Sequence, residues 1–297
     1  MTRTNKRQPA GRGTKAPAKA PAKAKAKAQT KTHRVSSPLP PATAQLLQQA
    51  IALQEQNRLS EALAQFNQLL SAQPGHALAH YKRGMALKGL GQLEQALASL
   101  DAALQVQPDY AECLANRGVL LQEMQRLDEA LACYDRALHY APRSALLHYN
   151  RGTVLEKMQC HTEALATYER AIALNPDHAI VHYNRGVMLE RLLRHTEAIA
   201  SYDRALALQP DYPGAQLNRA LCLLVIGNFE QGWPPYELRW KCDPLDKEIR
   251  FTEPPWLGQQ SLAGKTLLLH AEQGYGDTLQ FCRYTRLLAG MGARLVL

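Results

Sequence analysis

Four asparagines recur along the chain at a fixed interval of 34 residues: Asn116, Asn150, Asn184 and Asn218. A carboxamide carries hydrogen-bond donors and an acceptor, so it can hold a peptide-bond amide through two bonds, whatever the sequence of the peptide. Each bond contributes about 0.5–1.5 kcal/mol net, so a row of such groups binds better than any one member. The spacing predicts a row of carboxamides that binds an extended polypeptide.

The alternative is that the row is solvated surface, inherited when one repeat was copied several times. Against this alternative, asparagine is only a modest helix former, so four of them in register need a reason. At the matching positions nearer the N-terminus stand Gln48 and Lys82, so any row begins at Asn116. Both interpretations stay open at this point.

A second group of residues with possible chemistry lies near the C-terminus, where Gly274-Tyr275-Gly276 is followed by Asp277. A positioned carboxylate can serve as a general base, whereas its commoner role is to cap a helix. Backbone N–H groups at Gly274 and Gly276 could approach a nucleotide phosphate at a helix N-terminus. Leu279 replaces the third glycine of the dinucleotide fingerprint, so that motif is not present.

A 34-residue repeat positions the asparagines. Prolines follow one another at this interval, at positions 74, 108, 142, 176 and 210. We number each repeat so that its proline is position 32, which places the asparagines at position 6. The six repeats then begin at residues 43, 77, 111, 145, 179 and 213, and they are called the first to the sixth below.

Other positions of the repeat are equally regular. Position 8 holds glycine, position 20 alanine, position 24 a large residue and position 27 alanine. In the second to fifth repeats these residues are Gly84, Gly118, Gly152 and Gly186; Ala96, Ala130, Ala164 and Ala198; Leu100, Tyr134, Tyr168 and Tyr202; and Ala103, Ala137, Ala171 and Ala205. This pattern resembles the tetratricopeptide repeat (TPR), in which each repeat forms a pair of helices.

The resemblance implies an all-α, right-handed superhelix of about six helix-turn-helix repeats over residues 43–242. The two helices of a pair are expected at positions 1–14 and 18–31, with the small residues allowing their close approach and position 24 filling the space between pairs. The first helices should line a concave surface that binds a peptide or partner protein. The asparagine row resembles the ladder in the repeat domain of O-linked N-acetylglucosamine transferases, which holds extended polypeptides.

Several further positions carry expectations about local contacts. Arginine at position 7 should pair with acidic neighbours, and histidine at position 4 should serve packing, since histidines one repeat apart cannot share a metal ion. Residues with side-chain oxygens at position 18 could cap the second helices, and aspartates after the prolines could cap the first helices. They are Ser60, Asp128, Thr162 and Thr196, and Asp109, Asp177 and Asp211.

The sixth repeat departs from the pattern and is interpreted as a capping repeat. With Glu230 near the cap, Pro234 and Pro235 are expected in or near the first turn of its second helix, where missing N–H groups cost least. Residues 243–264 have no clear period and contain three prolines, so they are interpreted as a linker.

Residues 265–297 predict the first βαβ portion of a Rossmann-like α/β domain, with a strand at Thr266–His270, a helix at Asp277–Gly290 and a second strand from Arg294. Together with the segments around Trp233 and Trp256, this stretch resembles bacterial TPR proteins fused to a heptosyltransferase-like, two-lobed glycosyltransferase domain. The resemblance implies Asp277 as the base that deprotonates the acceptor, and a nucleotide-sugar as donor. The portion present cannot complete a donor site, so the segment is expected to be an incomplete domain.

The positive charge of the chain is confined to its N-terminus. The formal net charge is +9, but residues 1–40 hold 11 Lys and Arg and no Asp or Glu. Residues 1–42 are expected to be a disordered tail, either a solubilising extension or an arm that contacts nucleic acid or an anionic surface. No apolar run is long enough to span a membrane, and a cytoplasmic protein is expected. The spacing of the six cysteines predicts no metal site, and no cofactor is expected in this chain itself.

Overall fold

The computed structural model of the chain describes residues 40–239, 256, 260–269 and 282–296. It divides into two compact units, Met1–Pro244 and Leu245–Leu297, which are described separately. Residues 1–39 of the predicted tail and most of the predicted linker lie outside the described residues. The tail was predicted to extend to residue 42, whereas the first helix already begins at Pro41.

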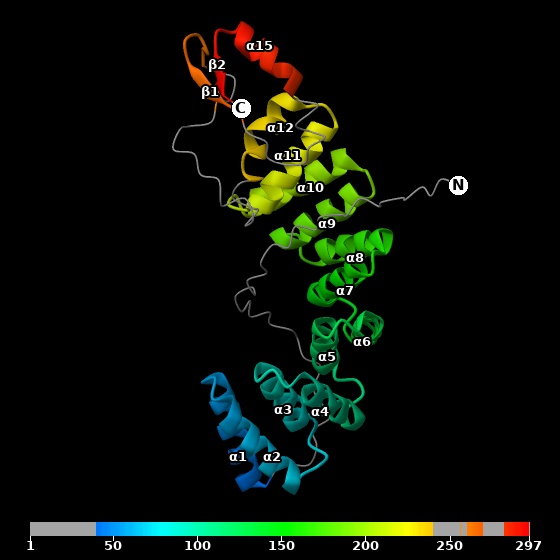
Figure 1. Cartoon of the computed structure of the whole chain (residues 1–297). Helices are drawn as coiled ribbons and strands as arrows, with labels where there is room; N and C mark the ends of the chain where they lie inside the picture. Colours follow the sequence, from blue (N-terminus) through cyan, green and yellow to red (C-terminus); the bar gives the residue numbers. More distant parts are fainter. Residues whose placement is uncertain (1–39, 240–255, 257–259, 270–281, 297) are drawn as a thin grey trace, which may run out of the picture. The chain divides into compact units, whose positions relative to one another are not determined.

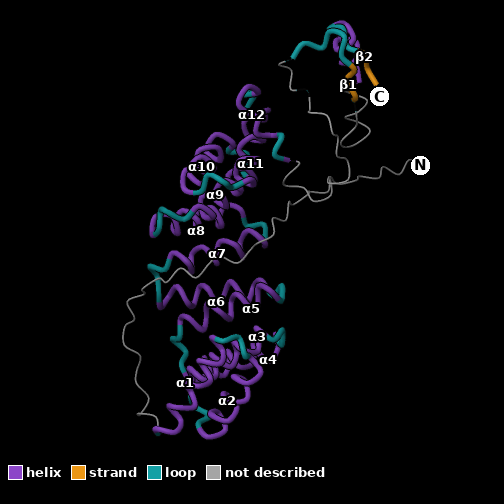
Figure 2. Tube along the Cα trace, turned by 90° about the vertical axis from the view of Figure 1, so that its left-hand side faces the viewer, coloured by secondary structure: helices purple, strands orange, loops and turns teal. Residues whose placement is uncertain are grey.

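The first unit is a series of antiparallel helix pairs, one pair per repeat, which follow one another in chain order (Figure 1, Figure 2). The first helices of the pairs are α1 (Pro41–Glu55), α3 (Ala77–Gly89), α5 (Ala111–Glu123), α7 (Ala145–Lys157), α9 (Ala179–Arg191) and α11 (Pro213–Val225). The second helices are α2 (Leu59–Ala72), α4 (Leu93–Val106), α6 (Leu127–Tyr140), α8 (His161–Leu174), α10 (His195–Leu208) and α12 (Phe229–Tyr236). The predicted pairs are confirmed, to within two residues at each end for most helices.

The small residues let the two helices of a pair approach closely, as predicted. The alanine at position 20 is fully buried in each of the first five repeats, for example Ala164. The glycine at position 8 lies against the residue at position 24, and a Cβ atom on Gly152 would be 2.5 Å from Cε1 of Tyr168. The fully buried ring of Tyr168 therefore lies within its own helix pair, rather than between pairs as predicted.

The predicted helix caps were wrong. The second helices begin at position 17, so the residue at position 18 already lies in the first turn, and the residue at position 16 has the N-cap place without a side-chain cap. In three repeats this residue is an arginine, which instead pairs with the glutamate three residues on: Arg58 with Glu61, Arg126 with Glu129 and Arg194 with Glu197. Two first helices are capped from position 34: His76 accepts a hydrogen bond from the Ala79 N–H group at 3.0 Å, and Ser144 accepts one from the Leu147 N–H group at 3.3 Å.

Pro234 and Pro235 were predicted in or near the first turn of α12, which is one turn too early. Asn228 caps this helix by accepting from the Gln231 N–H group at 3.3 Å, so α12 begins in the same register as the other second helices. Pro234 and Pro235 consequently lie beyond the first turn, where each removes a helical hydrogen bond. This explains why α12 has 8 residues, whereas α10 has 14.

The turn within each pair requires a left-handed residue at position 15. Glycine supplies it in two repeats, Gly91 with φ 76° and Gly227 with φ 83°. Four other residues adopt it without being glycine, and among them Leu193 has φ 59° and a side chain that is 78% exposed. A left-handed conformation costs a residue that has a Cβ atom about 1–2 kcal/mol.

Replacing Leu193 by glycine is therefore expected to stabilise the protein. Its exposed side chain contributes little packing, and relief of the strain exceeds the entropy cost of glycine, for a net gain of about 0.5–1 kcal/mol in the free energy of unfolding. Urea unfolding followed by circular dichroism measures the change. The reverse substitution, Gly91→Leu, should lose a similar amount, and a stabilising Gly91→Leu would contradict the argument.

The second unit contains a pair of short parallel strands, β1 (Thr266–Leu268) and β2 (Arg294–Val296), with Leu267 opposite Leu295. Between them the chain forms the 3₁₀ turn η2 (Cys282–Tyr284) and the helix α15 (Thr285–Gly290). Parallel strands need a crossover connection, so the predicted strand–helix–strand order is confirmed in outline. The described sheet has two strands, and no wider Rossmann-like sheet is seen in the described part of this unit.

Candidate peptide-binding surface

The first helices of the repeats form a continuous surface. Each of them after α1 packs against the second helix of the preceding pair, and α1 also contacts α3, α5 contacts α7 and α9 contacts α11. Positions 2 and 6 are one helical turn apart and therefore lie on the same face of a first helix. This face carries the four asparagines of the predicted row, all of which are half-buried.

Three of the four asparagines donate hydrogen bonds to tyrosine hydroxyl groups of the preceding repeat. Nδ2 of Asn116 lies 3.0 Å from the Tyr81 hydroxyl, and its other hydrogen reaches the Glu112 carbonyl oxygen at 2.9 Å. Nδ2 of Asn218 lies 3.3 Å from the Tyr183 hydroxyl and 3.5 Å from that of Tyr202. These carboxamides thus join neighbouring repeats, and their donors are largely used within the protein.

The third carboxamide, Asn184, belongs to a half-buried chain of polar groups. Its Nδ2 lies 3.5 Å from the Tyr168 hydroxyl, which donates to the Glu156 carboxylate at 2.8 Å. Burial raises the pKa of Glu156, although the Tyr168 hydrogen bond partly opposes this effect. Burial also raises the pKa of Tyr168. The next repeat has the same link, since the Tyr202 hydroxyl donates to Glu190 at 2.9 Å.

Asn150 differs from the other members of the row. Within the described residues its side chain makes no hydrogen bond, and only its backbone carbonyl accepts one from outside the helix ladder, from the Thr153 hydroxyl. The row was predicted as four equivalent carboxamides. The structure instead brings three of them to tyrosines and leaves one accessible.

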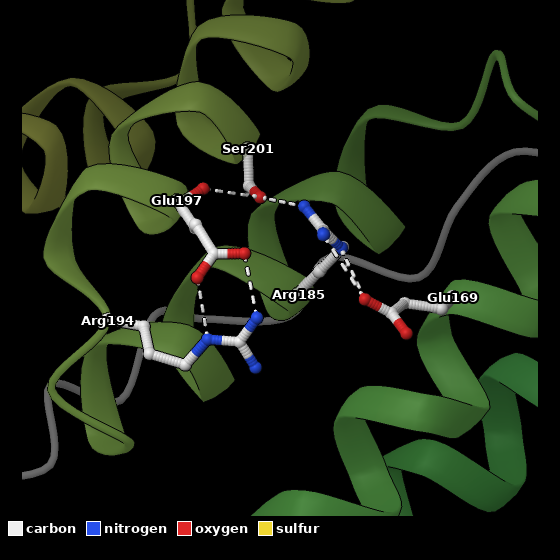
Figure 3. A network of polar contacts seen from close by, with 5 residues as sticks. All are labelled: Glu169, Arg185, Arg194, Glu197 and Ser201. Carbon is white, nitrogen blue, oxygen red and sulfur yellow. Dashed lines mark hydrogen bonds and ion pairs between the residues drawn. The ribbon is translucent and has the colours of Figure 1, made fainter.

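A second polar row joins the repeats through the arginine at position 7, as predicted. Arg185 contacts Glu169 of the preceding repeat at 3.2 Å and donates to the buried Ser201 hydroxyl of its own repeat at 2.6 Å (Figure 3). Ion pairs of the same kind join Arg117 with Asp101, Arg151 with Asp135 and Arg219 with Asp203. Arg83 departs from the prediction, since its partner in the preceding repeat is the Asn67 carboxamide, at 3.4 Å. The position-7 arginines therefore fix one repeat against the next and are not free to bind a ligand.

The histidine at position 4 makes a specific contact that the sequence did not predict. In three repeats its Nε2 atom donates to the carbonyl oxygen of the proline six residues earlier: His80 to Pro74 at 2.7 Å, His148 to Pro142 at 3.1 Å and His182 to Pro176 at 2.8 Å. In the sixth repeat the Gln216 amide makes the same bond to Pro210 at 2.9 Å. The residue at position 4 therefore holds the loop between repeats.

The burial of His182 makes stability depend on pH. Burial is the main cause that lowers the pKa of His182, Arg204 and Arg185 lower it further, and the Pro176 carbonyl and Asp177 act in the opposite direction. Because the folded pKa lies below the unfolded value of about 6.5, this contribution to stability is complete above that pH. It is lost as the pH falls from there through the folded pKa.

We expect the variant His182→Gln to reduce this loss of stability. Glutamine can make the same hydrogen bond, as Gln216 does, and it does not titrate. The midpoint of urea unfolding, measured from pH 7.5 to pH 5, should fall less steeply for the variant than for the wild type. Identical slopes for the two proteins would contradict the assignment.

The predicted catalytic residue lies elsewhere in the chain. Asp277, Gly274 and Gly276 fall outside the described residues, so their arrangement stays a prediction. In the part of the chain that is described, no cluster of three or more His, Cys, Asp or Glu side chains could hold a metal ion. None of the described helices is both long and apolar enough to cross a membrane.

Helix pairs with a 34-residue period, small residues at their contacts and polar links between repeats define a helical repeat scaffold of the kind that mediates protein interactions. The chain belongs to the tetratricopeptide repeat family. Two models of this family match it, one at residues 47–111, 81–121, 161–213 and 193–245 and the other at residues 111–144. The matches end at residue 245, and none of them is to a glycosyltransferase.

Solved structures with this fold are similar in architecture but distant in sequence. PilF of Pseudomonas aeruginosa is 20% identical, with a TM-score of 0.59 over 67% of this chain and 90% of that protein. MamA of Desulfovibrio magneticus RS-1 is 19% identical, with a TM-score of 0.55 over 58% of this chain and 97% of that protein. YrrB, described as a TPR protein with an unusual peptide-binding site, is 22% identical, with a TM-score of 0.54 over 60% of this chain and 92% of that protein. No curated protein matches the sequence significantly.

The tyrosines at position 5 were the main functional residues that the sequence interpretation missed. Tyr81, Tyr149 and Tyr183 each precede, by 35 residues, an asparagine of the following repeat. That spacing was the available signal, because position 5 of one repeat and position 6 of the next lie on neighbouring first helices.

Proposed function

We propose that the protein is a scaffold whose first helices bind an extended peptide or a partner protein. One observation carries the proposal. On two successive first helices an exposed apolar side chain lies one turn before a carboxamide: Leu146, 63% exposed, before Asn150, and Ile180, 37% exposed, before Asn184. Such a surface offers both apolar contact for side chains and hydrogen bonds for a peptide backbone.

The placement of these pairs further supports the proposal. First helices contact one another at α1 with α3, α5 with α7 and α9 with α11, which is expected on the inner, more tightly curved side of a stack of helix pairs. The helices α7 and α9, which carry the two pairs, both pack against α8. The two apolar–carboxamide pairs are one repeat apart, so an extended chain could contact both. The similarity to YrrB, which has a peptide-binding site, agrees with this class of ligand.

A peptide selection tests the function. A library of random dodecapeptides is displayed on phage and selected on the immobilised full chain. Selected peptides should bind at least about tenfold more weakly to the double variant Leu146→Ser, Ile180→Ser, because burial of two apolar side chains is lost. The variant Val106→Ser, which changes another exposed apolar residue on a second helix, is the matched control and should bind normally. The proposal fails if no peptide is enriched, or if the double variant binds the selected peptides as tightly as the wild type.

A second candidate function is transfer of a sugar from a nucleotide-sugar donor, with the repeats presenting the acceptor. The parallel pairing of β1 and β2 favours an α/β segment here, and Asp277 would be the base, with Gly274 and Gly276 near the donor phosphates. Transfer to a protein acceptor, assayed with a panel of nucleotide-sugars, should be lost in Asp277→Ala. Unaltered transfer by that variant would remove Asp277 from this role.

The basic N-terminus supports a further class of partner, nucleic acid or another anionic surface. Residues 1–40 contain 11 Lys and Arg and no acidic residue. Binding to a DNA duplex should therefore weaken steeply with salt and disappear when residues 1–40 are removed. Binding that is insensitive to salt, or to removal of these residues, would exclude the arm.

A further inference from the structure

At two junctions between repeats, a tyrosine at position 5 receives a hydrogen bond from the asparagine at position 6 of the next repeat. The Asn116 and Asn218 carboxamides reach the hydroxyls of Tyr81 at 3.0 Å and Tyr183 at 3.3 Å. At the junction of α7 and α9 the Asn184 carboxamide reaches the hydroxyl of Tyr168 at 3.5 Å, and the ring of Tyr149 at position 5 lies beside that of Tyr168, with 6.2 Å between centroids. A phenol hydroxyl is therefore the regular partner of this carboxamide.

The junction between α5 and α7, where Asn150 stands, lacks this partner. Position 5 of the third repeat is Ala115, which is half-buried, and Asn150 has no hydrogen bond there within the described residues. The nearby phenol of Tyr134 is directed elsewhere, since its hydroxyl donates to Oε1 of Gln122 at 3.5 Å. The carboxamide thus keeps its position in the row without the group that it contacts elsewhere.

A second ring is missing at the same junction. At the other three, the position-5 tyrosine packs on an aromatic residue at position 34: Tyr81 on Tyr110 at 5.2 Å, Tyr149 on His178 at 6.0 Å and Tyr183 on Tyr212 at 4.8 Å between ring centroids. Between α5 and α7 that place is held by Ser144, whose hydroxyl is occupied in capping α7. Two positions that carry rings elsewhere hold small side chains here, beside an accessible carboxamide.

We propose that the junction of α5 and α7 binds a tyrosine side chain of the partner, which replaces the tyrosine that the third repeat lacks. The phenol ring would lie over Ala115 and Ser144, with its hydroxyl at the Asn150 carboxamide. Leu146, exposed and one turn before Asn150, would contact an apolar residue next to the tyrosine. The inference rests on the proposed function and specifies its ligand: an extended segment with a tyrosine near an apolar residue.

Two peptides test the hydroxyl contact on the full chain: acetyl-Leu-Ser-Tyr-Ser-Leu-amide and the same peptide with phenylalanine in place of tyrosine. Isothermal calorimetry should give a dissociation constant about five- to tenfold lower for the tyrosine peptide, the effect of one hydrogen bond. Asn150→Ala should abolish this preference. Asn116→Ala is the matched control, because Tyr81 already occupies that carboxamide, and it should keep the preference. Equal binding of both peptides to the wild type would overturn the inference.

The variant Ala115→Tyr tests the site by filling it with a side chain of the protein itself. It restores the tyrosine found at the other junctions, so the tyrosine peptide should bind at least about tenfold more weakly, while the melting temperature stays equal or rises. Undiminished binding by this variant would overturn the inference.

The dodecapeptide selection separates the two proposals. Selected peptides that depend on Leu146 and Ile180 but contain no tyrosine would overturn this inference and leave the scaffold function intact. Absence of any enriched peptide would count against both.

Discussion

Replacing Tyr168 by alanine is expected to lower the free energy of unfolding by about 3–5 kcal/mol, the usual cost of removing a buried aromatic ring. The ring is fully buried between α7 and α8, against the Gly152 backbone, and its centroid lies 6.2 Å from that of Tyr149. The hydroxyl also donates to Glu156 and contacts Asn184 of the next repeat. One substitution therefore removes packing within a repeat and a polar link between repeats.

The loss should be concentrated around the fourth repeat, because each repeat contacts only its neighbours. Urea unfolding followed by circular dichroism measures the total change, and amide hydrogen exchange locates it. Exchange should accelerate most in α7, α8 and α9 and least in α3 and α4. Uniform acceleration throughout the first unit would show that the repeats unfold as one cooperative block.

The variant Tyr168→Phe is the matched control, since it retains the ring and removes only the hydroxyl. Its expected cost is about 1 kcal/mol, the value of one hydrogen bond. Because that bond opposes the effect of burial on Glu156, the pKa of Glu156 should rise further in this variant. An equal loss in the phenylalanine and alanine variants would mean that the hydroxyl, and not the packing of the ring, is responsible.

Substitution of Gly152 by alanine is expected to cost about 1–3 kcal/mol, although alanine is the better helix former by about 1 kcal/mol. The new Cβ atom would lie 2.5 Å from Cε1 and 2.8 Å from Cδ1 of Tyr168, closer than van der Waals contact allows. The ring cannot shift freely because its hydroxyl is bound to Glu156. Overpacking should therefore outweigh helix propensity.

Gly214→Ala provides the comparison within the same chain. Gly214 also lies in a first helix, but a Cβ atom there would meet the Tyr183 hydroxyl at 3.5 Å and two carbons of its ring at 3.7 Å, which are ordinary contacts. This variant should be neutral or gain up to about 1 kcal/mol from helix propensity. Measured side by side in urea, the two variants should shift the unfolding midpoint in opposite directions or by clearly different amounts. Similar shifts would contradict the packing argument.

A double-mutant cycle with Tyr168→Phe tests the reason for the cost. The first repeat already combines Ala50 at position 8 with Phe66 at position 24, both fully buried, so a methyl group fits beside a ring that has no hydroxyl. Gly152→Ala should consequently cost less in the Tyr168→Phe background than in the wild type. Strictly additive changes would show that the hydroxyl does not restrain the ring.

The sequence by itself determined the repeat architecture. A 34-residue period with small residues at positions 8 and 20 and a proline at position 32 leaves few alternatives to stacked helix pairs, because only stacking buries the apolar face of each pair. It also identified the position-7 arginines as partners of acidic residues. These features depend on contacts that repeat with the period, so one correct inference holds for every repeat.

Only the tertiary structure decided which groups of the surface are occupied. The four asparagines are identical in sequence register, yet three donate to tyrosines and Asn150 does not. Position 5 across its junction is Ala115, and the Tyr134 hydroxyl is directed to Gln122. The same is true of the helix caps, since a one-residue shift in where α8 begins moves Thr162 from the cap into the first turn. A hydrogen bond depends on distances of a few tenths of an ångström between separate helices. The period of the sequence specifies which helices are neighbours, and the packing of their side chains then decides which polar groups meet.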